Sequence, residues 1–169
     1  MSTTISDSEK RDRLKKLVSD FDTAMLVTHL KDGQLRSRPL AIAEKGEDGS
    51  LYFAISVDSA KVQEIAGDSH VNLSMQDKRR FVSVTGRARV VDDRAMVERL
   101  WSEAWKVWFP KGKDDPSLRI LIVDPSEAAY WDASGIEGLK YLFESAKAYL
   151  TGTRPDSDND QAHTAHVKM

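Results

Sequence analysis

Four residues in the first half of the chain have side chains suited to holding a phosphate group. Arg36 and Arg38 lie in an alternating segment, and Ser59 and Lys61 follow the next apolar segment, 51–57. Charged donors that reach an anion from more than one side bind a phosphate well, and the free N–H groups at a helix N-terminus add to them. A helix beginning at Ser59 would therefore complete a phosphate site with the two arginines. The alternative interpretation, which the spacing leaves open, is a pair of surface arginines beside an ordinary helix cap.

Six aromatic side chains form a second group of candidates. A flat ligand ring needs apolar walls with a few polar edges, and aromatic side chains supply such walls. Trp108 follows a predicted helix and Trp131 lies near the end of a predicted strand, where an aromatic residue can line a pocket or a subunit interface. Trp101 has the spacing of a core residue, and core or interface packing is the alternative for the others. The group comprises Trp101, Trp105, Trp108, Phe109, Tyr130 and Trp131.

Composition excludes several classes of site. The chain of 169 residues has no cysteine, which rules out disulfides, thiolate nucleophiles and cysteine-ligated metals. A formal net charge of −2 argues against a nucleic-acid-binding protein, because such binding usually needs a basic face. His163 and His166 lie in a polar segment without a carboxylate partner of fixed geometry, so we predict no metal site. No apolar run reaches membrane-spanning length and no leader pattern follows Met1, so we expect a cytoplasmic protein without a membrane partner.

Hydrophobic periodicity predicts about six short strands with helices placed between them at irregular intervals. Gly86 interrupts a long alternating segment, which indicates a β-bulge, and Pro39 favours an edge strand or a bulge. Asp58 would repel a phosphate, so we expect it to cap the helix that follows or to point away. The expected strands cover 24–30, 35–43, 51–57, 70–76, 81–91 and 118–123, with 128–132 continuing the last, and the expected helices cover 8–21, 59–66, 92–107 and 139–150.

These elements predict a mainly β fold with peripheral helices, in the form of a small closed or split antiparallel barrel. A regular alternation of strands and helices is absent, which argues against a doubly wound fold. The length fits one compact domain better than two, so we assign residues 1–152 to a single domain. Residues 153–169 are polar and lack an apolar stripe, and we expect them to form a disordered tail.

Several short segments, taken in their order and spacing, carry a resemblance to a known family. They are Arg36-Ser37-Arg38-Pro39-Leu40, Asp58-Ser59-Ala60-Lys61, Val71-Asn72-Leu73-Ser74, Phe81-Val82-Ser83-Val84-Thr85-Gly86 and Tyr130-Trp131-Asp132. Across residues 11–150 the chain resembles the general stress protein branch of the pyridoxamine 5′-phosphate oxidase-like, FMN-binding split-barrel superfamily. The resemblance implies a six-stranded antiparallel Greek-key split β-barrel. It also implies an obligate homodimer with two flavin sites at its interface, each built from both chains.

The same resemblance implies which residues hold the flavin. The phosphate, the ribityl chain and one ring edge would lie against the strand at 36–40 and the segment 53–61. Ser83 would approach from one side, and Trp108 and Trp131 would belong to the partner's wall. FMN is the expected cofactor, with FAD or a deazaflavin as alternatives. The full set of cofactor-binding residues is Arg36, Ser37, Arg38, Pro39, Phe53, Ala54, Ile55, Ser59, Lys61, Ser83, Trp108 and Trp131.

Three functional hypotheses follow from this set. The first is a flavin-dependent oxidoreductase of unknown substrate, with NAD(P)H as the candidate reductant, in which the bound ring carries the electrons. No catalytic side chain is predicted, because no Ser–His–Asp arrangement or paired carboxylates can be argued from the sequence. The second hypothesis is a flavin store or sensor without turnover. The third is a dimer that binds no cofactor and serves in protein interaction.

Overall fold

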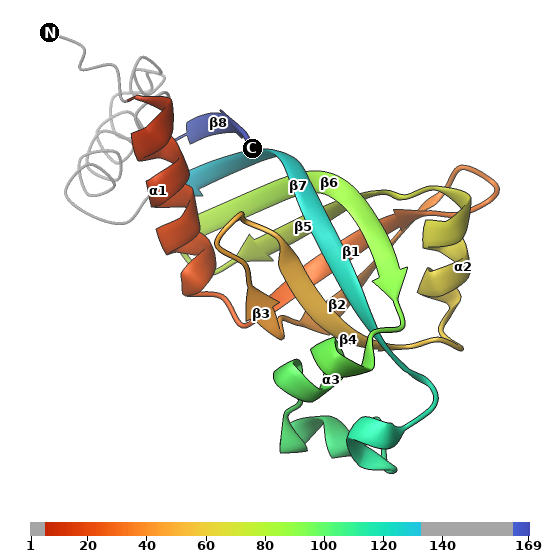
Figure 1. The fold of residues 1–169 in the computed structure, drawn as a ribbon. Helices are drawn as coiled ribbons and strands as arrows, with labels where there is room; N and C mark the ends of the chain where they lie inside the picture. Colours follow the sequence, from red (N-terminus) through yellow and green to blue (C-terminus); the bar gives the residue numbers. More distant parts are fainter. Residues whose placement is uncertain (1–5, 133–163) are drawn as a thin grey trace, which may run out of the picture.

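The computed structural model describes residues 6–132 and 164–169, which form one antiparallel sheet flanked by short helices (Figure 1). The strands follow the order β2-β1-β5-β6-β7-β4-β3 across the sheet, and β8 pairs with β7. The strands are β1 (Thr23–His29), β2 (Leu35–Ala41), β3 (Glu44–Lys45), β4 (Leu51–Ser56), β5 (His70–Gln76), β6 (Arg80–Val91), β7 (Leu118–Asp132) and β8 (Thr164–Lys168). The helices are α1 (Asp7–Ser19), α2 (Ala60–Gly67) and α3 (Arg94–Leu100), with short 3-10 helices η1 (Glu103–Val107) and η2 (Gly112–Asp114).

The sheet curls into a split barrel because the chain joins its two edges directly. β2 forms one edge and β3 the other, yet only Ile42 and Ala43 separate them along the chain. The Ile42 N–H donates to the Asp22 carbonyl at 2.9 Å and the Ala43 N–H to the Tyr52 carbonyl at 2.7 Å, which holds this link. The predicted mainly β antiparallel split barrel is thereby confirmed. The sequence predicts six strands, whereas the described residues form eight, with the two-residue β3 and the C-terminal β8 as additions.

Strand alternation divides the apolar side chains between the two sides of the barrel wall. On β4, Leu51, Phe53 and Ile55 point into the barrel and are at most 2% exposed, as their alternation predicts. Leu14 and Leu17 of α1 join the same core. A second apolar cluster lies on the outer side of β4 and β7 and fixes α3 and the turns after it against the wall. Its buried members are Val97, Phe109, Leu118, Ile120 and Ile122.

The predicted bulge at Gly86 is confirmed. The pairing register between β6 and β7 shifts between Thr85 and Gly86, and Gly86 lies opposite Pro125. A Cβ atom at position 86 would lie 2.3 Å from the Asp124 carbonyl oxygen, so only glycine fits without a backbone shift. β7 continues through Pro125 as one strand, because a proline at a bulge need not donate to the ladder.

The structure corrects the helix predicted at 92–107. α3 begins after Asp93, whose side chain accepts a hydrogen bond from the Met96 N–H at 3.0 Å, but it ends at Leu100. Trp101 leaves the helical conformation with φ −51° and ψ 133°, and helix resumes only in η1. The break allows Trp101 and Trp105 to pack edge to face, with ring centroids 5.7 Å apart, against the second apolar cluster. Packing of the two partly buried indoles therefore outweighs continuation of the helix.

The C-terminal residues give a second correction. The sequence predicts disorder from 153 onward, but Thr164–Lys168 form β8 on the outer end of β7, with Val167 opposite Ala128. Val167 is 3% exposed and joins the barrel core. Main-chain pairing and one buried valine order this strand, and neither produces an apolar stripe in the sequence. The predicted helix at 139–150 lies outside the described residues.

Candidate functional site

A cavity of about 400 Å³ opens between β2, β4, the start of α2 and the turns that follow α3. Figure 1 shows α3 and these turns as a separate layer next to β4. Because β2 and β4 lie on opposite sides of the split in the sheet, no strand of the described residues fills the space between them. The described residues that line the cavity are Pro39, Leu40, Ala41, Ala54, Ile55, Ser56, Ser59, Lys61, Trp105, Trp108 and Phe109.

The start of α2 supplies the polar end of this cavity. Ser59 is the N-cap residue, with extended backbone dihedrals of φ −75° and ψ 142°, but its hydroxyl makes no capping hydrogen bond. The Ser59 Oγ atom is buried, and it has no hydrogen-bond partner among the described residues. A buried polar atom without a partner costs about 1–3 kcal/mol, which a ligand that bonds to it would recover. The unpaired hydroxyl therefore marks a position where a polar ligand atom fits.

Lys61 adds a positive charge beside that hydroxyl. Burial and then the nearby Arg38 guanidinium hold the pKa of the Lys61 ammonium below its usual value, while Glu64 acts in the opposite direction. Within residues 6–132 and 164–169, no carboxylate lies at ion-pair distance from the Lys61 amine. A partly buried lysine without a paired anion, next to helix N–H groups, favours a negatively charged ligand.

Arg38 lies close enough to Lys61 to lower its pKa, and both Arg36 and Arg38 already have a protein partner. Arg38 donates from Nη2 to Glu64 Oε2 at 2.6 Å and from Nη1 to Thr28 Oγ1 at 2.8 Å, and Thr28 in turn donates to Glu64 Oε2 at 2.6 Å. Arg36 donates from Nη1 to Glu64 Oε1 at 3.0 Å. Burial opposes ionisation of Glu64, but the hydrogen bonds from Thr28 and Arg38 and the two guanidinium charges hold its pKa below the usual value. Glu64 therefore carries a negative charge within a cluster of three cations.

Aromatic side chains form the opposite wall of the cavity. Trp105 and Trp108 come from η1 and its C-cap, and Phe109, 4% exposed, anchors this segment in the second apolar cluster. Trp108 is 77% exposed although it lines the cavity, so much of its ring faces solvent. A flat ring bound between this wall and β4 would cover apolar surface on both faces.

Six of the twelve residues predicted from the sequence line this cavity together. Those six are Pro39, Ala54, Ile55, Ser59, Lys61 and Trp108. Arg36 and Arg38 lie in the adjacent Glu64 cluster, Ser37 lies on the exposed face of β2, and the Phe53 side chain points into the barrel core.

Ser83 and Trp131, also in that set, lie on the outer face of the sheet, opposite the buried side chains of β6 and β7.

The predicted set of twelve omits five lining residues and the Glu64 cluster, although Trp105 and Phe109 belong to the aromatic candidates. The lining residues are Leu40, Ala41, Ser56, Trp105 and Phe109. Leu40, Ala41 and Ser56 adjoin predicted site residues on the same two strands, so strand continuity was an available signal. Glu64 lies one helical turn after Lys61, and an acidic residue at that spacing on the same helix face is the signal that could have identified it.

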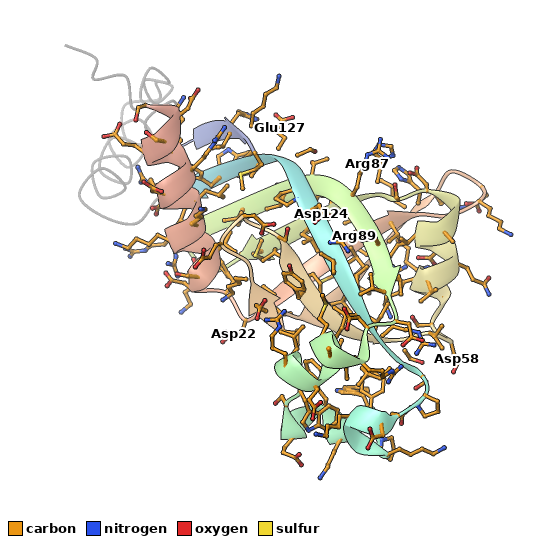
Figure 2. All side chains as sticks on the ribbon, viewed as in Figure 1. Asp22, Asp58, Arg87, Arg89, Asp124 and Glu127 are labelled. Carbon is orange, nitrogen blue, oxygen red and sulfur yellow. The ribbon has the colours of Figure 1, made fainter. Side chains whose placement is uncertain are left out.

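Asp58 does not enter the cavity. Its side chain is exposed, and Figure 2 shows it at the surface between the end of β4 and α2, directed away from the barrel. Arg87, Arg89 and Asp124 lie instead along β6 and β7 (Figure 2), where Arg89 Nε contacts the Asp124 carboxylate at 3.0 Å. These charges are thus separate from the cluster around Lys61.

A row of uncharged residues crosses the outer face of the sheet. Strand register aligns one row of five residues across five strands: Pro39, Met25, Ser74, Ser83 and Ala129. The next row of this face pairs Phe81 with Trp131, which are 43% and 40% exposed. Ser83 accepts a hydrogen bond from the Asn72 amide at 2.8 Å. Because Pro39 also lines the cavity, the cavity and this outer face share an edge.

The described residues offer neither a metal site nor a membrane-spanning helix. Among residues 6–132 and 164–169, no group of three histidine, aspartate or glutamate side chains is placed to hold a metal ion. In the same residues, no helix has the length and apolar character needed to span a membrane.

Known proteins share this sequence pattern and fold. The family described as pyridoxamine 5′-phosphate oxidase like matches residues 9–156. Protein bli-3 of Neurospora crassa is 27% identical over 142 residues, which cover 77% of this chain and 68% of that protein. General stress protein 26 of Bacillus subtilis is 29% identical over 89 residues, which cover 50% of this chain and 63% of that protein.

A solved structure extends the comparison to the fold. The general stress FMN/FAD binding protein of Xanthomonas citri is 30% identical and superposes with a TM-score of 0.64, covering 77% of this chain and 92% of that one. The family match spans most of the chain, and the relatives named as general stress proteins agree with it in fold and sequence. The chain therefore belongs to the pyridoxamine 5′-phosphate oxidase-like family, in its general stress protein branch.

Proposed function

We propose that this protein binds FMN in the cavity between β2, β4, α2 and η1. One observation carries the proposal: the Ser59 hydroxyl, which has no hydrogen-bond partner among the described residues, and the Lys61 ammonium both lie at one end of the cavity. A phosphate monoester bears acceptor oxygens and up to two negative charges, so it satisfies both groups. A relative named as an FMN/FAD binding protein gives this choice of ligand further support.

The residues along the cavity suit the remainder of such a ligand. The phosphate would lie against Ser59, Lys61 and the N–H groups that begin α2, within reach of the Arg38 guanidinium. The ribityl chain would pass along Ala54 and Ser56, whose small side chains leave space above β4. The ring system would lie against Trp105 and Trp108, where indoles offer flat apolar contact. FAD would extend beyond the phosphate, so the single cation cluster favours the monophosphate.

We propose further that the protein acts as a homodimer in which both chains complete each flavin site. The exposed side chains of Met25, Phe81 and Trp131 place large apolar groups on the outer sheet face, at 36%, 43% and 40% exposure. An obligate interface buries upwards of roughly 2,000 Å² in total, and a strand face of this kind is a suitable surface for it. Because Pro39 belongs to both this face and the cavity lining, a second chain seated on the face would reach the cavity edge.

The reaction that we propose is electron transfer, with NAD(P)H as reductant. A bound flavin supplies the hydride and electron chemistry, and the protein supplies orientation and electrostatics. Lys61 is the titratable residue of the described cavity lining, so it would hold the phosphate while backbone groups and Trp108 orient the ring. No side chain in that lining is placed to act as a carboxylate or imidazole base, which agrees with chemistry carried by the ring.

Absorption spectroscopy tests the binding proposal. Protein purified and then mixed with FMN should show a shifted flavin absorption band and quenched flavin fluorescence at a ratio of one flavin per chain. Steady-state oxidation of NADH or NADPH with a dye acceptor then tests turnover in the loaded protein. Saturable flavin binding without NAD(P)H oxidation would support a flavin store or sensor, and unchanged spectra would contradict the binding proposal altogether.

A further inference from the structure

Glu64 lies outside the cavity lining, where it joins three separate elements. It extends from α2 to Arg38 on β2 and to Thr28 on β1, and its side chain is 10% exposed. Thr28 is fully buried, and it both accepts from Arg38 and donates to Glu64. The three side chains thus form a closed ring of hydrogen bonds, in which each member fixes the orientation of the other two.

We infer that Glu64 is a positioning residue of the phosphate site, acting with Thr28 to fix the Arg38 guanidinium and the first turns of α2 where a phosphate monoester binds. This inference rests on the proposed binding of FMN. It goes beyond that proposal because Glu64 itself repels phosphate and does not line the cavity.

The geometry of α2 supports a positioning role. Glu64 follows Lys61 by three residues, so the two side chains emerge from the same helix face one turn apart. A tie between Glu64 and β2 therefore also sets the distance from Lys61 and Ser59 to that strand. Arg38 uses two of its five N–H donors in the ring, and the planar guanidinium presents the others in a fixed direction.

The charges of the cluster support the same role. Arg36, Arg38 and Lys61 are all cations, and after burial the Arg38 charge is the next cause that lowers the pKa of Lys61. One carboxylate among three cations leaves a net charge of two, which matches a phosphate monoester dianion. Groups that are held in place before the ligand arrives lose less conformational freedom on binding, so an ordered cluster binds more tightly than a mobile one.

Two substitutions disturb this geometry without changing the charge. Glu64→Asp keeps the carboxylate but shortens its reach by one methylene, and Thr28→Val removes the bridging hydroxyl while keeping the branched shape. The matched control is Glu98→Asp, which shortens a glutamate that pairs with Lys113 on the surface. Circular dichroism establishes that each variant is folded before ligands are titrated.

Each variant is titrated with FMN and with riboflavin, which lacks the phosphate. We expect Glu64→Asp and Thr28→Val to lower FMN affinity about tenfold, the effect of one weakened charge-assisted contact, and to leave riboflavin affinity unchanged. Phosphorus NMR of bound FMN gives a second readout. The second phosphate pKa, about 6 in free monoesters, should be depressed in the wild type and move back toward that value in both variants.

The outcomes separate this inference from the proposal on which it rests. If the wild type binds FMN and both variants bind it equally well, Glu64 has no positioning role. Equal losses of affinity for FMN and riboflavin would show that the hydrogen bonds among Glu64, Arg38 and Thr28 only support the fold. That result would likewise overturn the inference. If the wild type binds neither ligand, the proposed function itself fails.

Discussion

Replacement of Lys61 by alanine is the most direct test of the phosphate site. The side chain lines the cavity next to the unpartnered Ser59 hydroxyl, and it forms no ion pair with a described carboxylate. Its removal therefore breaks no hydrogen bond or ion pair to a described residue that would confuse the result. The protein should stay folded, because a partly buried charge without a partner contributes no ion pair to stability.

The expected size of the effect follows from the kind of contact that is lost. A hydrogen bond to a charged group contributes about 1.5–3 kcal/mol. Loss of one such contact corresponds to a roughly ten- to hundredfold weaker affinity. FMN affinity should fall by this factor in Lys61→Ala, whereas riboflavin, which has no phosphate, should bind both proteins alike.

The pH dependence of FMN affinity tests the same prediction independently. Burial and the Arg38 charge lower the pKa of Lys61, so the amine loses its proton at a lower pH than an ordinary lysine does. A dianion binds the protonated amine better, so wild-type affinity for FMN should fall as the pH rises through the lowered pKa. Lys61→Ala should lack this alkaline decline, and riboflavin should show none with either protein.

Fluorescence titration of both flavins against wild type, Lys61→Ala and Lys16→Ala measures all of these quantities. Lys16 is an exposed lysine of α1, outside the cavity lining, and it serves as the matched control. The reasoning is refuted if FMN and riboflavin lose affinity equally, or if neither does. In the second case Lys61 would be only a solvated lysine in the first turn of a helix.

Three further predictions concern the fold and the assembly. Val167→Ala should lower the free energy of unfolding by about 1–2 kcal/mol, since it removes buried apolar surface. Lys168→Ala, at the exposed neighbouring position, should not lower it. Equal denaturation midpoints for the two variants would show that β8 does not pack on the barrel. Gly86→Ala should lower the free energy of unfolding by roughly 1–3 kcal/mol, because the new Cβ meets a backbone carbonyl. The control Gly67→Ala, whose Cβ meets nothing within 4 Å, should be tolerated, and coinciding unfolding curves for the two variants would contradict the bulge geometry. Phe81→Asp should convert the proposed homodimer to a monomer in sedimentation experiments at micromolar concentration, and an unchanged mass would place the interface elsewhere.

Local patterns were enough to predict the barrel, because strand alternation and turn chemistry act within a few residues. The inward set on β4 and the bulge at Gly86 both follow from such short-range signals. The break at Trp101 does not, since it arises when two indoles pack against a wall formed by β4 and β7. β8 could not be predicted from local sequence either, because its order comes from pairing with a strand more than thirty residues away along the chain.

The same distinction applies to the candidate site: some of its residues are predictable from local sequence, and others meet only in the folded chain. Ser59 and Lys61 were predictable because one helix start places both of them. The partner of Arg36 and Arg38 was not, because Glu64 meets them only after α2 folds back beside β2. The arginines and the lysine look equivalent in the sequence, yet only Lys61 is left without a described carboxylate partner.

This difference bears on how the three cations would share the work of binding. Arg38 is hydrogen-bonded to both Glu64 and Thr28, so its guanidinium would present its remaining donors to a phosphate in a fixed orientation. Lys61 has a flexible stem and no described carboxylate at ion-pair distance, so it can adjust to the ligand at small cost. Arg36, more exposed than Arg38 and bonded to the other Glu64 oxygen, balances the charge of that carboxylate from the solvent side.

The positions of Ser83 and Trp131 complete the argument about assembly. Both lie on the outer face of the sheet, and neither lines the cavity of its own chain. The family resemblance implies that both belong to the flavin site, and in the proposed homodimer a second chain would bring its outer face to the cavity edge. Pro39 is the place where this can happen, because it belongs to the cavity lining and to the row that contains Ser83. A site arranged in this way would make flavin binding and pairing of the chains mutually supportive, since each flavin would add contacts that only the dimer provides.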